Sequence, residues 1–406
     1  MGCGTSAEAV KSQTTPVHLQ KPFDDNGERN LHDFYEVEHV IGQGSVAKCK
    51  RGIEKTSRKP FAIKILDRKS SEFDYDGLRL EIEVMRKVDH PGCVKLFDVF
   101  EDKKHVYLIQ ELASGGELFD RVSENGAYSE ADAATLFKQV MEAVAHLHSM
   151  GICHRDLKPE NVLMKSDDRN SSAYNVVKLA DFGLSTFKAD DYNDTMVTAC
   201  GTPEYIAPEI IVTLKEGGSS SRTYSAKVDV WAAGVILYVM LCGFQPFQLE
   251  SQNAMYQAIQ YGRFSFPSPE WDVVSQEAKD YIKTVLQVKP SKRPTAADCL
   301  KHPWIKQVAF GRTESLGINE NLKQYNANLG KKRFKKAVNV VTAVKRMQLL
   351  TSGSSSSILA AAKAAQRAEQ VARGGASPEA GPSDSEVGNG EEGPTDSPNG
   401  IGESVQ

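Results

Sequence analysis

One stretch decides how this sequence is interpreted: His154-Arg155-Asp156-Leu157-Lys158-Pro159-Glu160-Asn161. Within it, Asp156 can accept a proton from a hydroxyl group, Lys158 can neutralise a phosphoryl oxygen, and Asn161 can bind a metal ion. Further along the chain, Asp181 offers a carboxylate to the same metal–phosphate cluster. Phosphoryl transfer asks a protein mainly to position reacting groups and to neutralise charge. These residue types in this order therefore indicate phosphoryl transfer.

Three further motifs give the stretch its context: Phe61-Ala62-Ile63-Lys64, Asp181-Phe182-Gly183 and Ala207-Pro208-Glu209. With them, the sequence resembles the eukaryotic protein Ser/Thr kinase family over residues 34–306. The resemblance implies an α+β fold, the bilobal protein kinase fold, in which a β-rich N-lobe and a helical C-lobe enclose an ATP cleft. It also implies ATP and Mg²⁺ as cofactors and Ser/Thr residues of other proteins as substrates.

The resemblance implies a role for each residue of the site. Asp156 would orient and deprotonate the substrate hydroxyl, and Lys158 would contact the transferred phosphoryl group. Asn161 and Asp181 would hold Mg²⁺. The residues that it implies for nucleotide binding are Ile41, Gly42, Gln43, Gly44, Ser45, Val46, Ala47, Lys48, Cys49, Ala62, Lys64, Glu81, Glu111, Ala113 and Leu163.

The glycine-containing loop departs from the family pattern. Glycine lets a backbone approach phosphates without a Cβ in the way, but Ala47 stands at the third glycine position and Cys49 at the usual valine. The loop is therefore a degenerate match, supported by Lys64 after it. Glu81 has the spacing expected of the ion-pair partner of Lys64, and the alternative, Glu83, would face solvent.

The segment after the strand at residues 106–109 resembles the hinge between the lobes. Backbone groups of Glu111 and Ala113 would hydrogen-bond adenine, and Gln110 would control access to the space behind it. Glu117 could hold a basic substrate side chain or the ribose, or could be a solvated acid at the start of a helix. Together with Glu160, it suggests substrates with a basic residue upstream of the target.

The segment from Asp181 to Glu209 is expected to be controlled by phosphorylation. Arg155 would be an isolated buried cation unless an anion paired with it. A phosphate on Thr198, added by an upstream kinase, would provide that anion and order the segment. Thr202, by contrast, is expected to be structural.

A basic stretch follows the kinase-like region, within residues 307–350. Residues 331–347 hold seven cations and no acid. Four apolar residues, Phe334, Val338, Val341 and Met347, fall on one face of a helix, as in calmodulin targets. The stretch resembles the regulatory helix of calcium/calmodulin-dependent protein kinases, most closely type I, and residues 318–329 would block the cleft. The alternative is a helix that docks on its own lobe or on an anionic membrane.

Both ends of the chain lack a core-forming pattern. Residues 1–33 are interpreted as a flexible tail that starts with a signal for myristoylation of Gly2, beside Cys3 as a palmitoylation site. The alternative is an unmodified start that happens to begin Met-Gly. Residues 351–406 are interpreted as a disordered acidic tail.

The bulk properties limit the class of protein. The net charge of −4 gives no reason to expect nucleic acid binding. Seven scattered cysteines without a C-x-x-C pair argue against a disulfide framework and for a reducing compartment. No apolar run is long enough to cross a bilayer. We therefore expect a cytoplasmic protein, peripheral to a membrane through its acylated start.

Three alternatives stay open from the sequence. A calmodulin-independent kinase could use the basic helix for a membrane or lobe contact. A pseudokinase scaffold would keep the fold without turnover, which the degenerate glycine loop alone favours. A membrane-recruited adaptor would need only the acylated start and the basic helix.

Overall fold

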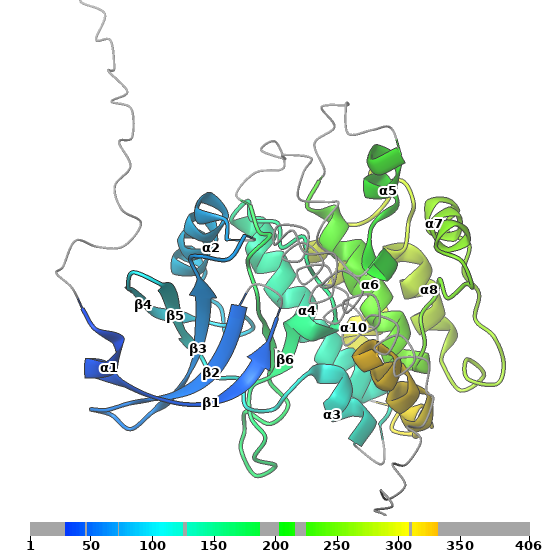
Figure 1. Ribbon diagram of the computed structural model, residues 1–406. Coiled ribbons are helices and arrows are strands. Elements are labelled where there is room, and N and C mark those ends of the chain that lie inside the picture. The colour runs from blue at the N-terminus through cyan, green and yellow to red at the C-terminus, as the bar shows by residue number, and fades with distance from the viewer. Residues whose placement is uncertain are drawn as a thin grey trace, which may run out of the picture. The chain divides into compact units, whose positions relative to one another are not determined.

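A five-stranded antiparallel sheet forms the N-lobe in this computed structural model, which describes residues 29–44, 47–71, 73–124, 128–186, 203–215, 225–307 and 311–331. The strands lie in the order β1-β2-β3-β5-β4 (Figure 1). Their bounds are Tyr35–Gln43 for β1, Ala47–Glu54 for β2, Pro60–Asp67 for β3, Leu96–Glu101 for β4 and His105–Glu111 for β5.

The register of the sheet decides which side chains reach the cleft between the lobes. Lys64 of β3 pairs with Cys49 of β2 and with Leu108 of β5. Successive side chains of a strand point to opposite faces, so Ile63 and Ile65 lie on the outer face. There Ile63 is fully buried in a small core with residues such as Tyr35.

The helix α2, Tyr75–Lys87, packs against this sheet (Figure 1). It begins at Asp74, whose side chain accepts a hydrogen bond from the backbone N–H of Asp76. One face of α2 is buried, and Glu81 lies on that face with only 3% of its surface exposed. A carboxylate buried to this degree needs a cation as a partner.

Helices make up the C-lobe, and their bounds are Leu118–Glu124 for α3, Glu130–Ser149 for α4, Pro208–Lys215 for α5, Lys227–Cys242 for α6, Gln252–Tyr261 for α7, Gln276–Val285 for α8, Ala296–Cys299 for α9 and Pro303–Gln307 for α10. A short hairpin, β6 (Val162–Met164) and β7 (Val177–Leu179), lies beside them. A further helix spans residues 319–331.

The core of the C-lobe is built around α4 and α6. A capping box, in which Ser129 and Asp132 each bond the other's backbone N–H, begins α4. Helix α6 is apolar on all sides, and its residues from Val228 to Cys242 are buried, as expected of a central helix. It ends at Gly243, which has the left-handed conformation that glycine accepts at helix ends.

A short helix, α1, precedes the sheet. It spans Leu31–Phe34 and buries Leu31, and Arg29 before it pairs with Asp98 at 2.7 Å. No helix in the described ranges is long and apolar enough to span a membrane.

Candidate active site

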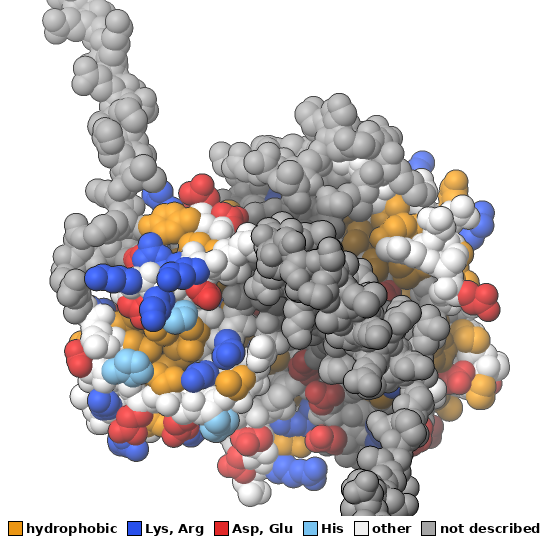
Figure 2. All heavy atoms as spheres, viewed as in Figure 1, with side chains coloured by type: hydrophobic (Ala, Val, Ile, Leu, Met, Phe, Trp, Pro, Cys, Tyr) orange, Lys and Arg blue, Asp and Glu red, His pale blue; other side chains and the backbone are white. Residues whose placement is uncertain are grey.

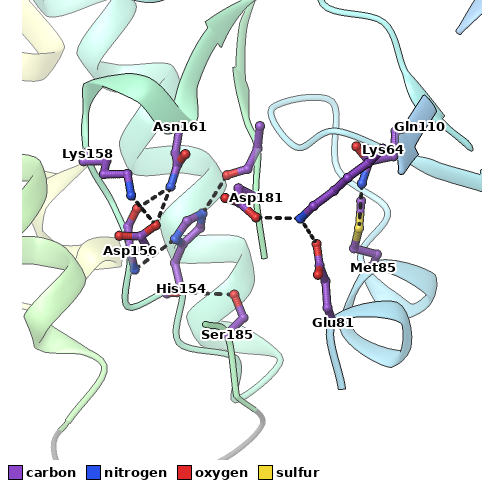
Figure 3. A network of polar contacts seen from close by, with 11 residues as sticks. Lys64, Glu81, Met85, Gln110, His154, Asp156, Lys158, Asn161, Asp181 and Ser185 are labelled. Carbon is purple, nitrogen blue, oxygen red and sulfur yellow. Dashed lines mark hydrogen bonds and ion pairs between the residues drawn. The ribbon is translucent and has the colours of Figure 1, made fainter. Parts of the chain in front are cut away.

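The catalytic-loop residues are brought together by one turn of 3-10 helix, η1 (Pro159–Asn161). The Lys158 ammonium donates to Asp156 Oδ2 at 2.6 Å, and the Asn161 amide donates to the same oxygen at 3.0 Å. The Asn161 amide also donates to the Asp156 carbonyl at 2.7 Å. Figure 3 shows these three side chains converging from one loop. Two donors fix the orientation of the Asp156 carboxylate.

Asp229 anchors the backbone of this loop from below. Its carboxylate accepts hydrogen bonds from the backbone N–H groups of His154 and Arg155, both at 2.8 Å, and lies 2.9 Å from His148 Nε2. Arg155 adopts a positive φ of 64°, which is uncommon for a residue with a side chain. The loop therefore keeps a strained backbone that Asp229, on helix α6, stabilises.

Lys64 joins the two lobes through a pair of carboxylates. Its ammonium lies 2.7 Å from Glu81 Oε1 and 2.9 Å from Asp181 Oδ1 (Figure 3). The predicted partner, Glu81, is thus the one that Lys64 contacts. Glu83 faces outward and pairs with Lys87 at 2.9 Å. The Lys64–Glu81 ion pair thus joins α2 to β3 of the sheet.

The charges of this cluster shift its ionisation. The ammonium of Lys64 lowers the pKa of Asp181 to about 2, more than the burial of Asp181 raises it. Burial alone would lower the pKa of Lys64, but the charges of Glu81 and Asp181 outweigh burial and raise it. Burial likewise disfavours the ammonium of Lys158, and the charge of Asp156 overcomes this and raises the pKa of Lys158. Asp181, Lys64 and Lys158 are therefore ionised at neutral pH.

Phe182 and His154 hold Asp181 in place. The Phe182 ring is fully buried and lies 5.3 Å from the His154 ring. His154 Nε2 lies 3.2 Å from the carbonyl oxygen of Ala180. Asp181 itself has a φ of 63°, so its backbone is strained where its carboxylate reaches the cleft.

The hinge is tied to the C-lobe by an ion pair that the sequence analysis missed. Lys178, on β7, donates to Glu111 Oε2 at 2.6 Å and to the backbone carbonyl of Cys93 at 3.3 Å. Only 5% of the Lys178 side chain is exposed. No local sequence pattern indicates which acid the buried Lys178 contacts.

The other nucleotide-site residues surround this cluster. Ala62 is buried on β3 beside Lys64, and Leu163 lies on β6 opposite Lys178. Gln110 donates to Met85 Sδ on α2 at 3.4 Å, so it is held against the helix behind the site (Figure 3). The glycine-loop residues Ser45 and Val46 lie outside the described residues.

The side chains of the glycine loop do not all face the nucleotide site. The structure places seven of these residues in or next to the adjoining ends of β1 and β2: Ile41, Gly42, Gln43, Gly44, Ala47, Lys48 and Cys49. Cys49 is opposite Lys64 across the strands, so its side chain shares the cleft face. By the same alternation, Lys48 belongs to the outer face, and its side chain does not point toward Lys64.

The helix over residues 319–331 packs against the C-lobe close to the catalytic loop. The hydroxyl group of Tyr325 is hydrogen-bonded to that of Tyr205 in η3 (Pro203–Tyr205). The Tyr325 ring also meets Phe119 of α3, with ring centroids 5.7 Å apart. Burial is the main cause of the raised pKa of Tyr325, and the negative charges of Glu160 and Glu204 raise it further. Tyr325 therefore lies near Glu160 of the catalytic loop.

Several predicted sites cannot be placed. Gly2, Cys3, Thr198, Phe334, Val338, Val341 and Met347 lie outside the described residues. Arg155, the predicted partner of a phosphate on Thr198, is partly buried.

The donor set fits a magnesium ion shared with phosphates. Because the amide nitrogen of Asn161 donates to Asp156, its oxygen is the atom left to act as a ligand. No group of three or more His, Cys, Asp or Glu side chains in the described ranges could hold a metal alone. Magnesium is commonly bound by one or two protein ligands together with phosphate oxygens and water, which Asn161 and Asp181 could provide here.

Comparison with known proteins places these motifs in one family. The protein kinase domain family matches residues 35–305. The chain is 39% identical to calcium/calmodulin-dependent protein kinase type 1 of Macrobrachium nipponense over 84% of this chain and 94% of the relative. It is 42% identical to calcium/calmodulin-dependent protein kinase type I of Schizosaccharomyces pombe, covering 76% and 88% of the two chains. Myosin light chain kinase A of Dictyostelium discoideum is 40% identical over 68% of this chain and 89% of the relative.

Proposed function

This chain belongs to the protein kinase family and is a Ser/Thr protein kinase of the calcium/calmodulin-dependent type, and we propose that its C-terminal segment inhibits it until calcium-loaded calmodulin binds. The observation that carries this proposal is the contact of Tyr325 with Tyr205. Tyr205 lies near the end of the activation segment, Asp181 to Glu209, so a helix seated on it would control the substrate side of the cleft.

In the proposed reaction, Asp156 orients the substrate hydroxyl and accepts its proton. Lys64, held by Glu81, contacts the α- and β-phosphates of ATP, and Lys158 stabilises the transferred phosphoryl group. Asn161 and Asp181 would hold Mg²⁺, which neutralises charge on the phosphate oxygens. The backbone of Glu111 and Ala113 would bind adenine, with the Glu111 side chain fixed by Lys178.

Calmodulin is proposed to act through the basic stretch after residue 331. Its anchors would be Phe334, Val338, Val341 and Met347, which have the spacing of one helix face. The names of the type I relatives support calcium/calmodulin dependence. Because this stretch continues directly from the helix over 319–331, a partner that binds it competes with the contact at Tyr205.

Two modifications complete the proposal. An upstream kinase would phosphorylate Thr198, and the new charge would pair with Arg155 and order the activation segment. Acylation of Gly2 and Cys3 would hold the enzyme, which we propose is cytoplasmic, at a membrane surface, since two acyl chains give stable anchoring where one does not.

Substrates are proposed to carry an arginine upstream of the target residue. Glu160 lies in the catalytic loop between Lys158 and Asn161, and one of its carboxylate oxygens is buried. Val239, a fully buried residue of α6, stands where some kinases that prefer basic substrates carry a second acid. We therefore expect one arginine to matter, and equal rates on peptides with that arginine replaced by alanine would contradict this.

The decisive experiment measures phosphorylation of an arginine-containing Ser/Thr peptide by the full chain, with and without Ca²⁺/calmodulin. Asp156→Asn serves as the blank, because it removes the proposed base and keeps the shape. Strong activation, and constitutive activity after truncation before Ile318, would support the proposal. Activity that ignores calmodulin would reassign the basic helix to a membrane or lobe contact, and no turnover under any condition would favour a scaffold.

A further inference from the structure

A hollow of about 460 Å³ lies on the outer face of the N-lobe sheet, away from the catalytic cluster. Its floor is apolar and is formed by Val37, Ile65 and Tyr107, which pack on the small core of this lobe. Figure 2 shows apolar side chains on the face that β1 and β2 turn to the viewer, with basic and His side chains around them. A hollow of this volume is in the range of binding pockets.

The hollow shares Gln43, Gly44 and Ala47 with the glycine loop, but its apolar floor lies on the face of the sheet opposite Lys64. Lys48 pairs with Ile65 and Lys50 pairs with Ile63 across β2 and β3. Lys64 lies between Ile63 and Ile65 in β3, so its side chain points to the opposite face of the sheet. A ligand in the hollow would therefore contact the back of the sheet that carries the glycine loop.

Charge at the rim favours an acidic occupant. Lys48 and Lys50 both line the hollow, and within the described ranges neither makes an ion pair or a side-chain hydrogen bond. One acid, Asp67, also lines it, and its carboxylate accepts a hydrogen bond from the backbone N–H of Lys69. An occupant with an aromatic group followed by carboxylates would match an apolar floor and two lysines.

The sequence carries such a segment directly before the residues that form one wall of the hollow. Leu31 and His32 of α1 form part of its wall, and the preceding residue Arg29 is fixed to Asp98. The sequence before Arg29 reads Pro22-Phe23-Asp24-Asp25-Asn26-Gly27-Glu28. Six residues in extended form span about 20 Å, which is enough for Phe23 to reach a hollow that already touches residues 31 and 32.

We propose that residues 22–25 dock in this hollow, with Phe23 on the apolar floor and Asp24 and Asp25 beside Lys48 and Lys50. The docked segment would cross the strands whose ends carry the glycine loop. It would thereby link the N-terminal segment to the nucleotide site without entering it.

The test uses Phe23→Trp in the full chain and acrylamide quenching of tryptophan fluorescence. The three native tryptophans, Trp231, Trp271 and Trp304, are at most 1% exposed, so quenching reports almost solely on the introduced residue. A synthetic peptide of residues 16–28 with the same substitution gives the value for full exposure. Docking predicts a quenching constant severalfold below that of the peptide.

Two sets of variants identify the surface. In the Phe23→Trp chain, Lys48→Glu with Lys50→Glu should raise the quenching constant to the peptide value. The matched control, Lys289→Glu with Lys292→Glu on the C-lobe, should leave it unchanged. Adding Asp24→Lys and Asp25→Lys to the Lys48→Glu, Lys50→Glu chain should restore protection, because the charges are then exchanged.

Clear outcomes would overturn the proposal. One is a quenching constant equal to that of the peptide in the otherwise unaltered chain. Another is protection of the introduced tryptophan from quenching that survives Lys48→Glu with Lys50→Glu. Protection that survives this pair and is lost only when the acidic residues 374–406 are removed would also contradict the proposal. Thermal unfolding checks that each variant is folded, and Lys48→Gln with Lys50→Gln replaces the charge reversal if that pair lowers the midpoint.

Discussion

Tyr325 and Tyr205 are hydrogen-bonded through their hydroxyl groups, although 120 residues separate them in the sequence. The amide of Gln245 donates to the same Tyr325 hydroxyl at 3.4 Å. The helix over residues 319–331 is further held by Asn326, which donates to Asp120 at 2.9 Å, and by Asn321, which donates to the Cys242 carbonyl at 3.2 Å. This helix thus ties the end of the activation segment to the C-lobe.

Tyr325→Ala is expected to raise the activity measured without calmodulin by about tenfold. The substitution removes a buried ring and its hydrogen bond, and a loss of about 1.4 kcal/mol in docking changes the docked population tenfold. The measurement is peptide phosphorylation by the full chain without Ca²⁺. Tyr261→Ala is the control, because Tyr261 is 61% exposed; an equal rise in both would show that the Tyr205 contact does not inhibit.

Glu81→Gln is expected to lower kcat/KM for ATP by at least about tenfold, since Lys64 then loses the carboxylate that positions it. Glu83→Gln, two residues away on the same helix, should have no effect because Glu83 contacts only the exposed Lys87. Steady-state kinetics with varied ATP give the comparison. Similar losses in both variants would mean that helix α2 matters only through its fold.

Lys178→Met is expected to destabilise the protein by about 3 kcal/mol, because the Glu111 carboxylate loses its buried partner and keeps only the more exposed Lys165, 3.5 Å away. The double variant Lys178→Met, Glu111→Met should recover much of that loss, since no buried charge is then left without its partner. Urea unfolding measures both. A double variant as unstable as the single one would show that the charge itself stabilises the hinge.

Asp229→Asn is expected to have an effect on stability that depends on pH. Burial alone would raise the pKa of Asp229, but its hydrogen bond with His148 and the nearby charges lower it to about 2. A lowered pKa means that the carboxylate stabilises the folded state above about pH 4, and that this is lost as the pH falls through about 2. The free energy involved is about 2 kcal/mol at neutral pH.

The measurement is urea unfolding of the wild type and of Asp229→Asn at pH 7, 5 and 3. The difference between them should be largest at pH 7 and 5 and smaller at pH 3. Asp280→Asn, at an exposed aspartate paired with Lys283, is the control and should change little. A difference that does not vary with pH would mean that the shape of Asp229, and not its charge, anchors the catalytic loop.

Much of the site followed from local sequence. Asp156, Lys158 and Asn161 lie within six residues, so one turn brings them together and their spacing is enough to identify them. The pair of Lys64 and Glu81 also followed, because family spacing distinguished Glu81 from Glu83.

Other features depended on contacts between distant segments. The sequence did not indicate the partner of Lys178, because a strand pattern predicts the face on which a side chain lies but not the residues that pack on that face. The contact of Arg29 with Asp98 of β4 was likewise not indicated by any local pattern.

The sequence by itself indicated the family, the candidate catalytic residues and the order of the two lobes, because these depend on residue types at short, fixed spacings. Only the tertiary structure decided that Tyr325 closes on Tyr205, that Glu111 is fixed by Lys178, and that the N-lobe sheet has a hollow behind the glycine loop. Each of these depends on which surfaces pack together, and packing is set by burial and charge summed over the whole fold.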